Sequence, residues 1–198
     1  MAVARTVGAL DAPLRRLFET IEPYADLHAP DLEEVAAALR MLAHDHDYLV
    51  PAIERMGDVS ASTPLHMPER GPRLFLVHRR TGEMSAVHDH QVWVAIAPVT
   101  GIETHRRWRP RAANDPARLS VEAEQAVGPA EYVTLLPPDD IHDHGHRLGV
   151  GDAAYVLILL GDDQFRYERH EWDPESGRVR TLRPGDRGRW LASEPFPG

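Results

Sequence analysis

Two histidines one residue apart, His88 and His90, have the spacing that most directly suggests chemistry. On an extended strand, residues i and i+2 lie on the same face, so both imidazoles would project into one cavity. Neutral imidazoles at chelating distance are typical ligands for divalent transition metals. Burying both rings without a shared partner would be costly, which favours a metal site over two core histidines. The sequence therefore predicts metal ligation by His88 and His90.

His44 and His46 form a second His-Asp-His sequence, but the surrounding residues differ. It lies at or beyond the end of a predicted helix over 31–44. In a helix, residues i and i+2 diverge by about 200° around the axis, so the two rings would not share a ligand. We interpret this pair as solvated surface.

A third ligand is expected from the later segment that contains His142, His144 and His146. His142 and His144 share a face if the segment is extended, so either could be that ligand. His146 is a candidate catalytic residue near the substrate. Tyr155, in the apolar segment that follows, is a second candidate catalytic residue if it faces the cavity.

Several carboxylates surround these histidines in the sequence. Asp89 would point away from the cavity on a regular strand, where it could make outward hydrogen bonds. Metal-bound histidines usually donate their second N–H to a carboxylate or a carbonyl, so nearby acidic residues could orient the imidazoles. The candidates for that task are Asp139, Asp140 and Asp143. Either Glu103 or Arg107 could also line the cavity from the strand after Gly101.

A mainly β fold must position these residues. From Arg73 onward, short β-branched or aromatic segments alternate with Gly and Pro, which is typical of a closed barrel or a sandwich. The expected strands cover 73–80, 85–99, 101–110, 117–126, 131–138, 153–161, 165–173 and 178–185. Residues 174–177, Pro-Glu-Ser-Gly, predict a hairpin between the last two.

Helices are expected before the barrel. Segment 13–22 opens with Pro13, which suits the first turn of a helix, and segment 31–44 opens with Asp31 as an N-cap. The stretch 58–72 is interpreted as a polar connection. We therefore predict a single domain over residues 1–198, with 1–57 as a helical extension packed on a β-barrel over 73–190.

Composition excludes several classes of function. The formal net charge is −9 and no dense basic stripe is present, which argues against nucleic-acid binding. No apolar run approaches the roughly 20 residues needed to span a bilayer, and no convincing signal peptide is evident. The chain lacks Cys and Lys, which excludes thiolate chemistry and a Schiff-base lysine. We expect a cytoplasmic monomer or homodimer that acts on a small molecule.

The histidine spacing resembles the two motifs of the cupin superfamily. The first motif is Gly, five residues, His-x-His, three or four residues, Glu, six residues and Gly. It is matched at Gly82, His88, His90 and Gly101, whereas Val94 stands at the Glu position. The second motif, Pro-x-Gly-x-x-His-x-x-x-Asn, is matched at Pro137 and His142, with Asp139 at the Gly position and His146 at the Asn position. The resemblance implies a cupin double-stranded β-helix, or jelly-roll barrel. It also implies that His142 is the favoured third metal ligand, with His144 as its main rival.

A site of three neutral histidines without the Glu resembles the thiol dioxygenases among cupins. Residues 73–165 are similar to the cysteine-dioxygenase-like family in the order of their strands and histidines. That resemblance implies a mononuclear non-haem Fe(II) dioxygenase that oxidises a small thiol or similar molecule with O2. The ligand type alone equally suits Ni, Zn, Mn or Cu.

Cysteine itself is not the expected substrate. The family's Ser-His-Tyr set is missing from the apolar strand 153–160, where Tyr155 is offset. Arg70 or Arg73 could bind a substrate carboxylate, although neither aligns cleanly with the family's arginine. Two alternatives stay open: a non-redox isomerase or hydrolase that uses Zn or Mn as a Lewis acid, and a non-catalytic cupin that senses a small molecule.

Overall fold

The computed structural model describes residues 10–146, 151, 153–189 and 191–196. Residues 1–9 of the predicted helical extension, and 147–150, 152 and 190 of the predicted barrel, lie outside the described residues. The helices are α1 (Ala12–Ile21), α2 (Leu32–Ala43) and α3 (His46–Met56), with a 3-10 turn η1 (Gln164–Arg166). The strands are β1 (Ala61–His66), β2 (Arg73–Arg80), β3 (Val87–His88), β4 (Val94–Thr100), β5 (Glu103–Ala112), β6 (Asp115–Val127), β7 (Val133–Leu135), β8 (His142–His146), β9 (Ala153–Leu160), β10 (Arg169–Asp173) and β11 (Arg178–Leu182).

Aspartate side chains cap the N-termini of two of the helices. The Asp31 side chain accepts a hydrogen bond from the Glu34 amide at 3.4 Å, as predicted for the start of α2. Asp45 accepts from the Tyr48 amide at 3.2 Å and starts α3 directly after the end of α2. These bonds satisfy amide groups that have no partner inside the helix.

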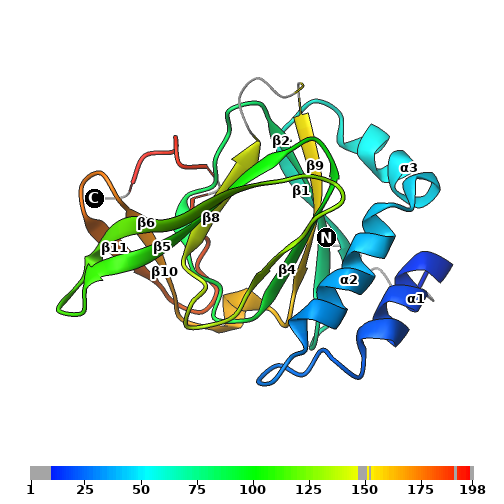
Figure 1. Ribbon diagram of the computed structural model, residues 1–198, viewed down its shortest axis with the longest axis horizontal. Helices are drawn as coiled ribbons and strands as arrows, with labels where there is room; N and C mark the ends of the chain where they lie inside the picture. Colours follow the sequence, from blue (N-terminus) through cyan, green and yellow to red (C-terminus); the bar gives the residue numbers. More distant parts are fainter. Residues whose placement is uncertain (1–9, 147–150, 152, 190, 197–198) are drawn as a thin grey trace, which may run out of the picture.

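The strands form two antiparallel sheets, in the orders β1-β2-β9-β4-β7 and β11-β10-β3-β8-β5-β6. Within them, the eight strands β2 to β9 follow the jelly-roll arrangement, with β2-β9-β4-β7 facing β3-β8-β5-β6. The two sheets curl around a common interior, and the three helices lie outside the first sheet (Figure 1). The predicted fold, a mainly β double-stranded β-helix with N-terminal helices packed on it, is confirmed.

Three details differ from the expected strands. The stretch 58–72 is not only a connection, because β1 lies within it and pairs with β2 along Ala61↔His78 to His66↔Leu74. The expected strand 85–99 is divided into β3 and β4, which belong to opposite sheets. The expected strand 165–173 begins as the turn η1 and becomes extended only at Arg169.

Apolar side chains are buried on both faces of the first sheet. One cluster joins the helices to this sheet and includes Leu39, Leu49, Trp93 and Leu157. A second cluster fills one end of the barrel interior and includes Ile96. The buried side chains also include several histidines, which are described next. None of the described helices is long and apolar enough to cross a bilayer.

Candidate metal centre

The structure brings His88, His90 and His142 together inside the barrel. His88 on β3 lies directly opposite His142 on β8, so their side chains share the inward face. His90 follows the end of β3, and its ring still turns back toward the other two. The ring centroids are 4.7 Å apart for His88 and His90, 4.6 Å for His88 and His142, and 5.0 Å for His90 and His142. One nitrogen from each ring lies within 4.8 Å of the others.

Hydrogen bonds at Nδ1 fix how each imidazole is presented. His88 Nδ1 lies 2.8 Å from the Ala86 carbonyl oxygen, and His142 Nδ1 lies 2.8 Å from that of Asp140. His90 Nδ1 lies 2.6 Å from Gln164 Oε1. Because a carbonyl oxygen can only accept, each Nδ1 carries the proton and each Nε2 presents a lone pair. This is the tautomer that metal-bound histidines adopt.

The inward nitrogens fit a cation. His88 Nε2 and His90 Nε2 are 3.1 Å apart, so two lone pairs face each other at short range. His142 Nε2 is buried and has no hydrogen-bond partner among the described residues. A divalent metal would satisfy all three nitrogens at once, whereas three unpaired buried acceptors would be costly. The donor set of three neutral imidazoles therefore fits the predicted metal.

Burial keeps these imidazoles uncharged. Burial lowers the pKa of His88, and it lowers the pKa values of His90 and His142 well below the ordinary 6.5. Because a histidine must be neutral to bind a metal, all three rings are ready for ligation at neutral pH.

The turn after β3 is held by a carboxylate from a distant segment. Asp140 Oδ2 accepts from the main-chain amides of His90 at 2.9 Å and Gln91 at 3.0 Å. Gln91 has φ 59°, in the left-handed region, which turns the chain from one sheet toward the other. As predicted, Asp89 bonds outward, because it accepts from the His170 amide at 2.6 Å and pairs with His170 Nδ1 at 2.9 Å.

The predicted orienting carboxylates have different roles. Of the three, only Asp140 contacts the centre. Its carbonyl oxygen accepts from His142 Nδ1, and its carboxylate accepts from the His90 amide. Asp143 instead forms an ion pair with Arg106, and Asp139 pairs with Arg109 at 2.9 Å.

His144 and Glu103 form a second buried group beside the centre. Glu103 Oε2 lies 3.0 Å from His144 Nδ1 and 3.1 Å from His105 Nε2. Burial would raise the pKa of Glu103, but the two histidines hold it below its ordinary value. Burial lowers the pKa of His144 to about 4 despite the Glu103 charge. His144 is therefore tied to Glu103, while His142 completes the three-histidine group.

Other predicted residues lie away from the three-histidine group. Tyr155 stacks on His78 with ring centroids 4.6 Å apart and packs against the helix-side cluster, on the face of β9 opposite the cavity. His146 has both ring nitrogens near main-chain oxygens, at 2.9 Å from Ile102 and 3.4 Å from Gly151. Arg70 is exposed, and Arg73 forms an ion pair with Asp163 at 3.0 Å.

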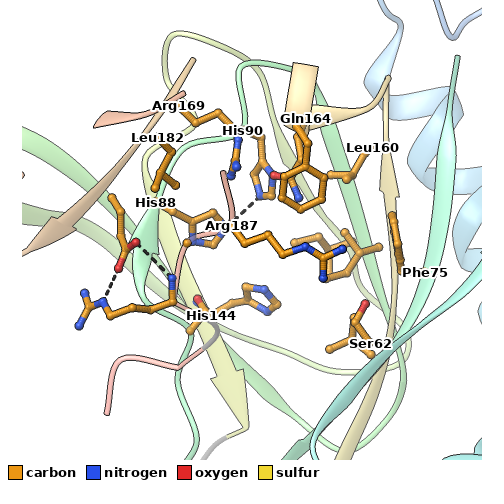
Figure 2. A pocket seen from close by; sticks show the side chains of 18 of the residues that line it. Ser62, Phe75, His88, His90, His144, Leu160, Gln164, Arg169, Leu182 and Arg187 are labelled. Carbon is orange, nitrogen blue, oxygen red and sulfur yellow. Dashed lines mark hydrogen bonds and ion pairs between the residues drawn. The ribbon is translucent and has the colours of Figure 1, made fainter. Parts of the chain in front are cut away.

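A cavity of about 460 Å³ opens next to the histidines. Figure 2 shows His88, His90 and His144 on one side of it, with Phe75 and Ser62 on the other. The apolar part of its wall is formed by Phe75, Val77, Ile96, Ile158 and Leu160. The C-terminal segment adds Gln164, Arg169, Arg187 and Arg189. Sequence reasoning missed these four, because no local spacing links them to the histidines.

Comparison with known proteins adds only weak similarities. No family model matches the chain, and no curated protein matches it. An RmlC-like cupin from Methanocaldococcus jannaschii is 12% identical over 56% of this chain and 86% of its own, with a TM-score of 0.41. A double-stranded β-helix protein from Klebsiella pneumoniae is 9% identical over 70% and 83%, with a TM-score of 0.42. A cupin-like protein of unknown function from Ralstonia eutropha is 16% identical over 67% and 65%, with a TM-score of 0.41. The function must therefore be argued from the site itself.

Proposed function

We propose that the chain is a mononuclear non-haem Fe(II) dioxygenase that oxidises a small thiol or similar small molecule with O2. The observation that carries the proposal is the convergence of three Nε2 lone pairs from His88, His90 and His142. Three neutral ligands leave the double positive charge of the metal uncompensated by the protein. That charge favours an anionic ligand such as a thiolate in the open positions.

The residues of the chain hold and shield the reacting groups. His88, His90 and His142 would hold Fe(II), which when bound supplies the activation of O2, with both oxygen atoms entering the product. Ala86, Asp140 and Gln164 keep the imidazoles in the ligating tautomer through their oxygens. The apolar wall keeps bulk water away from the reactants, which strengthens the electrostatic interactions inside the cavity.

The choice of a thiol as substrate rests on the family resemblance of the sequence, supported by the size of the cavity. A volume of about 460 Å³ suits a small molecule and not a polymer. Three imidazoles also suit Zn or Mn, so a non-redox isomerase or hydrolase is the second candidate.

Metal analysis and oxygen consumption test the proposal together. Untagged protein is expected to hold about one equivalent of Fe(II) after anaerobic reconstitution, and His88→Ala is expected to hold almost none. His46→Ala is the matched control. It changes an exposed histidine of the His44 and His46 pair, and this variant should keep its metal.

The loaded protein is then supplied with a panel of small thiols in an oxygen electrode. Oxygen uptake with formation of a sulfinate supports the dioxygenase. Stoichiometric metal without oxygen uptake for any of these thiols would favour the non-redox enzyme or the sensor. Equal metal in wild type and His88→Ala would contradict the metal centre.

A further inference from the structure

The group of Glu103, His105 and His144 lies beside the three-histidine centre and is not used by the proposed metal. All three side chains are nearly inaccessible to solvent, with exposed fractions of 0%, 4% and 3%. The rings of His142 and His144 are 5.8 Å apart, so this group adjoins the metal ligands. His105 and His144 lie opposite each other on β5 and β8, which places both rings on the inward face.

One carboxylate oxygen determines the tautomer of His144. Glu103 Oε2 accepts from His144 Nδ1 at 3.0 Å and from His105 Nε2 at 3.1 Å. A carboxylate has no proton to give, so both of these nitrogens carry hydrogen in the neutral rings. His144 Nε2 is then an acceptor, and it makes no hydrogen bond to any residue that the structure describes. The ring lines the same cavity as His88 and His90, and Figure 2 shows it directed into that cavity.

We propose that His144 is a specificity-determining residue whose Nε2 accepts a hydrogen bond from a hydroxyl or amine of the molecule bound at the three histidines. The inference rests on the proposed function, because it needs a ligand attached to the metal. A molecule that binds the metal through one atom and carries a donor on a neighbouring carbon would satisfy both the cation and His144. A purely apolar thiol would leave Nε2 without a partner, which is costly in a buried site.

A second metal held by Glu103, His105 and His144 is the competing interpretation. Charge disfavours it. The Arg79 side chain is only 2% exposed, and the Glu103 carboxylate is close enough to stabilise its positive charge. A second divalent ion would add further positive charge beside the first. Hydrogen bonding instead lets Glu103 balance Arg79 and orient both rings without another cation.

The tautomer can be observed in the wild-type protein. Long-range ¹H–¹⁵N spectra of ¹⁵N-histidine protein loaded with Zn(II) distinguish an N–H nitrogen from a lone-pair nitrogen in each ring. We expect His144 to carry its proton on Nδ1. A proton on Nε2, or a second equivalent of Zn(II) bound through His144, would overturn the inference. This measurement needs no variant and therefore does not depend on the folding of one.

Binding of two thiol probes tests the recognition itself. 2-Mercaptoethanol and 1-propanethiol have similar length, but only the first carries a hydroxyl donor. Titration into Co(II)-loaded protein, followed by thiolate-to-cobalt absorption, gives each dissociation constant. In His144→Phe we expect 2-mercaptoethanol to bind about five- to tenfold more weakly, the usual effect of one hydrogen bond. 1-Propanethiol should bind equally well or more tightly, because it no longer leaves an acceptor without a partner.

Two further variants complete the comparison. Glu103→Gln keeps the His144 ring but allows the other tautomer, so it should lose the same selectivity. His66→Phe makes the same substitution in a ring that contacts Phe18 of α1, outside the cavity, and should keep the wild-type ratio. Probes that bind with the same ratio in wild type and His144→Phe would overturn this inference alone. Failure to bind Co(II) at all would remove the proposed function and this inference with it.

Discussion

At the scale of single residues, the site depends on which nitrogen of each imidazole carries the proton. His88 and His142 both bond to the carbonyl oxygen two residues earlier, a local arrangement that each strand supplies by itself. His90 differs, because its Nδ1 depends on Gln164, which is 74 residues away in the chain. The sequence could therefore predict that these three histidines lie together, but not the amide that orients one of them.

Removal of the Gln164 amide should weaken metal binding. Gln164→Leu leaves His90 Nδ1 without its acceptor, so the ring loses its fixed tautomer and orientation. We expect metal affinity to fall about 10- to 100-fold, the usual cost of losing such a partner. Competition with a chromophoric chelator for Zn(II) measures the change. Gln125→Leu, on an exposed part of β6, is the control, and equal affinities for both variants would contradict the orienting role.

The buried histidines should make the metal-free protein sensitive to mild acid. An unfolded histidine takes up a proton near pH 6.5, whereas folded His144 resists protonation until about pH 4. Between these two pH values the unfolded chain binds more protons than the folded protein. The unfolding free energy is therefore highest above pH 6.5 and falls as the pH is lowered. The contribution of His144 is on the order of 3 kcal/mol. The pKa of Glu103 is lowered, so its contribution is lost only below about pH 4.5.

Urea unfolding of metal-free protein between pH 8 and pH 4.5 measures this loss. His144→Asn should show a shallower decline of the unfolding free energy below pH 6.5 than the wild type. His46→Asn changes an exposed ring and should retain the wild-type slope. A flat profile for the wild type would contradict the neutral, buried state of these rings.

At the scale of elements, the alternating pattern predicted most strands but not where the chain changes sheets. Residues 85–99 contain no Gly and only Pro98 near their end, so the sequence gives no local sign of the break between β3 and β4. The break is stabilised by Asp140, whose side chain accepts two amides of a turn about fifty residues earlier. Such long-range hydrogen bonds leave no periodic signal in either segment. The polar segment 58–72 likewise hid β1, which is stabilised by pairing with β2.

Close packing of β8 against the turn before β3 gives an element-scale prediction. A Cβ on Gly145 would lie 2.0 Å from the Glu83 carbonyl oxygen and 2.7 Å from Met84 Cα, both main-chain atoms. Gly145→Ala should therefore force these segments apart and destabilise the protein by about 2 kcal/mol or more. Gly128→Ala meets only a Glu131 oxygen at 3.8 Å and serves as the control. Equal urea midpoints for the two variants would refute this packing.

At the scale of the whole molecule, the helix-side apolar cluster and the cavity lie on opposite faces of one sheet. The helices pack on its outer face (Figure 1). Side chains of its inner face, such as Phe75, Ile96 and Ile158, line the cavity. The indole N–H of Trp93, in the helix-side cluster, donates to the Asp26 carbonyl oxygen at 3.1 Å and so connects this face to the loop between α1 and α2. The sequence predicted helices packed on a barrel, because amphipathic spacing is local. It could not show which sheet they cover, because that depends on the strand order.

This separation predicts that stability and metal binding can be changed independently. Leu39 of α2 is fully buried between the helices and the sheet, so Leu39→Ala should cost about 2–5 kcal/mol of unfolding free energy. Its metal affinity under native conditions should match the wild type. Met41→Ala, at a position that is 75% exposed, should alter neither property. A parallel loss of metal affinity in Leu39→Ala would show that the helices shape the site.

The strand that carries His88 is only two residues long, and it shares a single residue pair with β8. The residues just before β3 are bonded to β8 as well, because the Ser85 amide donates to the His144 carbonyl oxygen at 2.8 Å and the His146 amide to that of Glu83 at 3.1 Å. A cation shared by His88 and His142 would add a further connection between these two segments. Removal of the metal would lower the stability of this part of the barrel, so we expect a protease to cleave metal-free protein faster than metal-loaded protein.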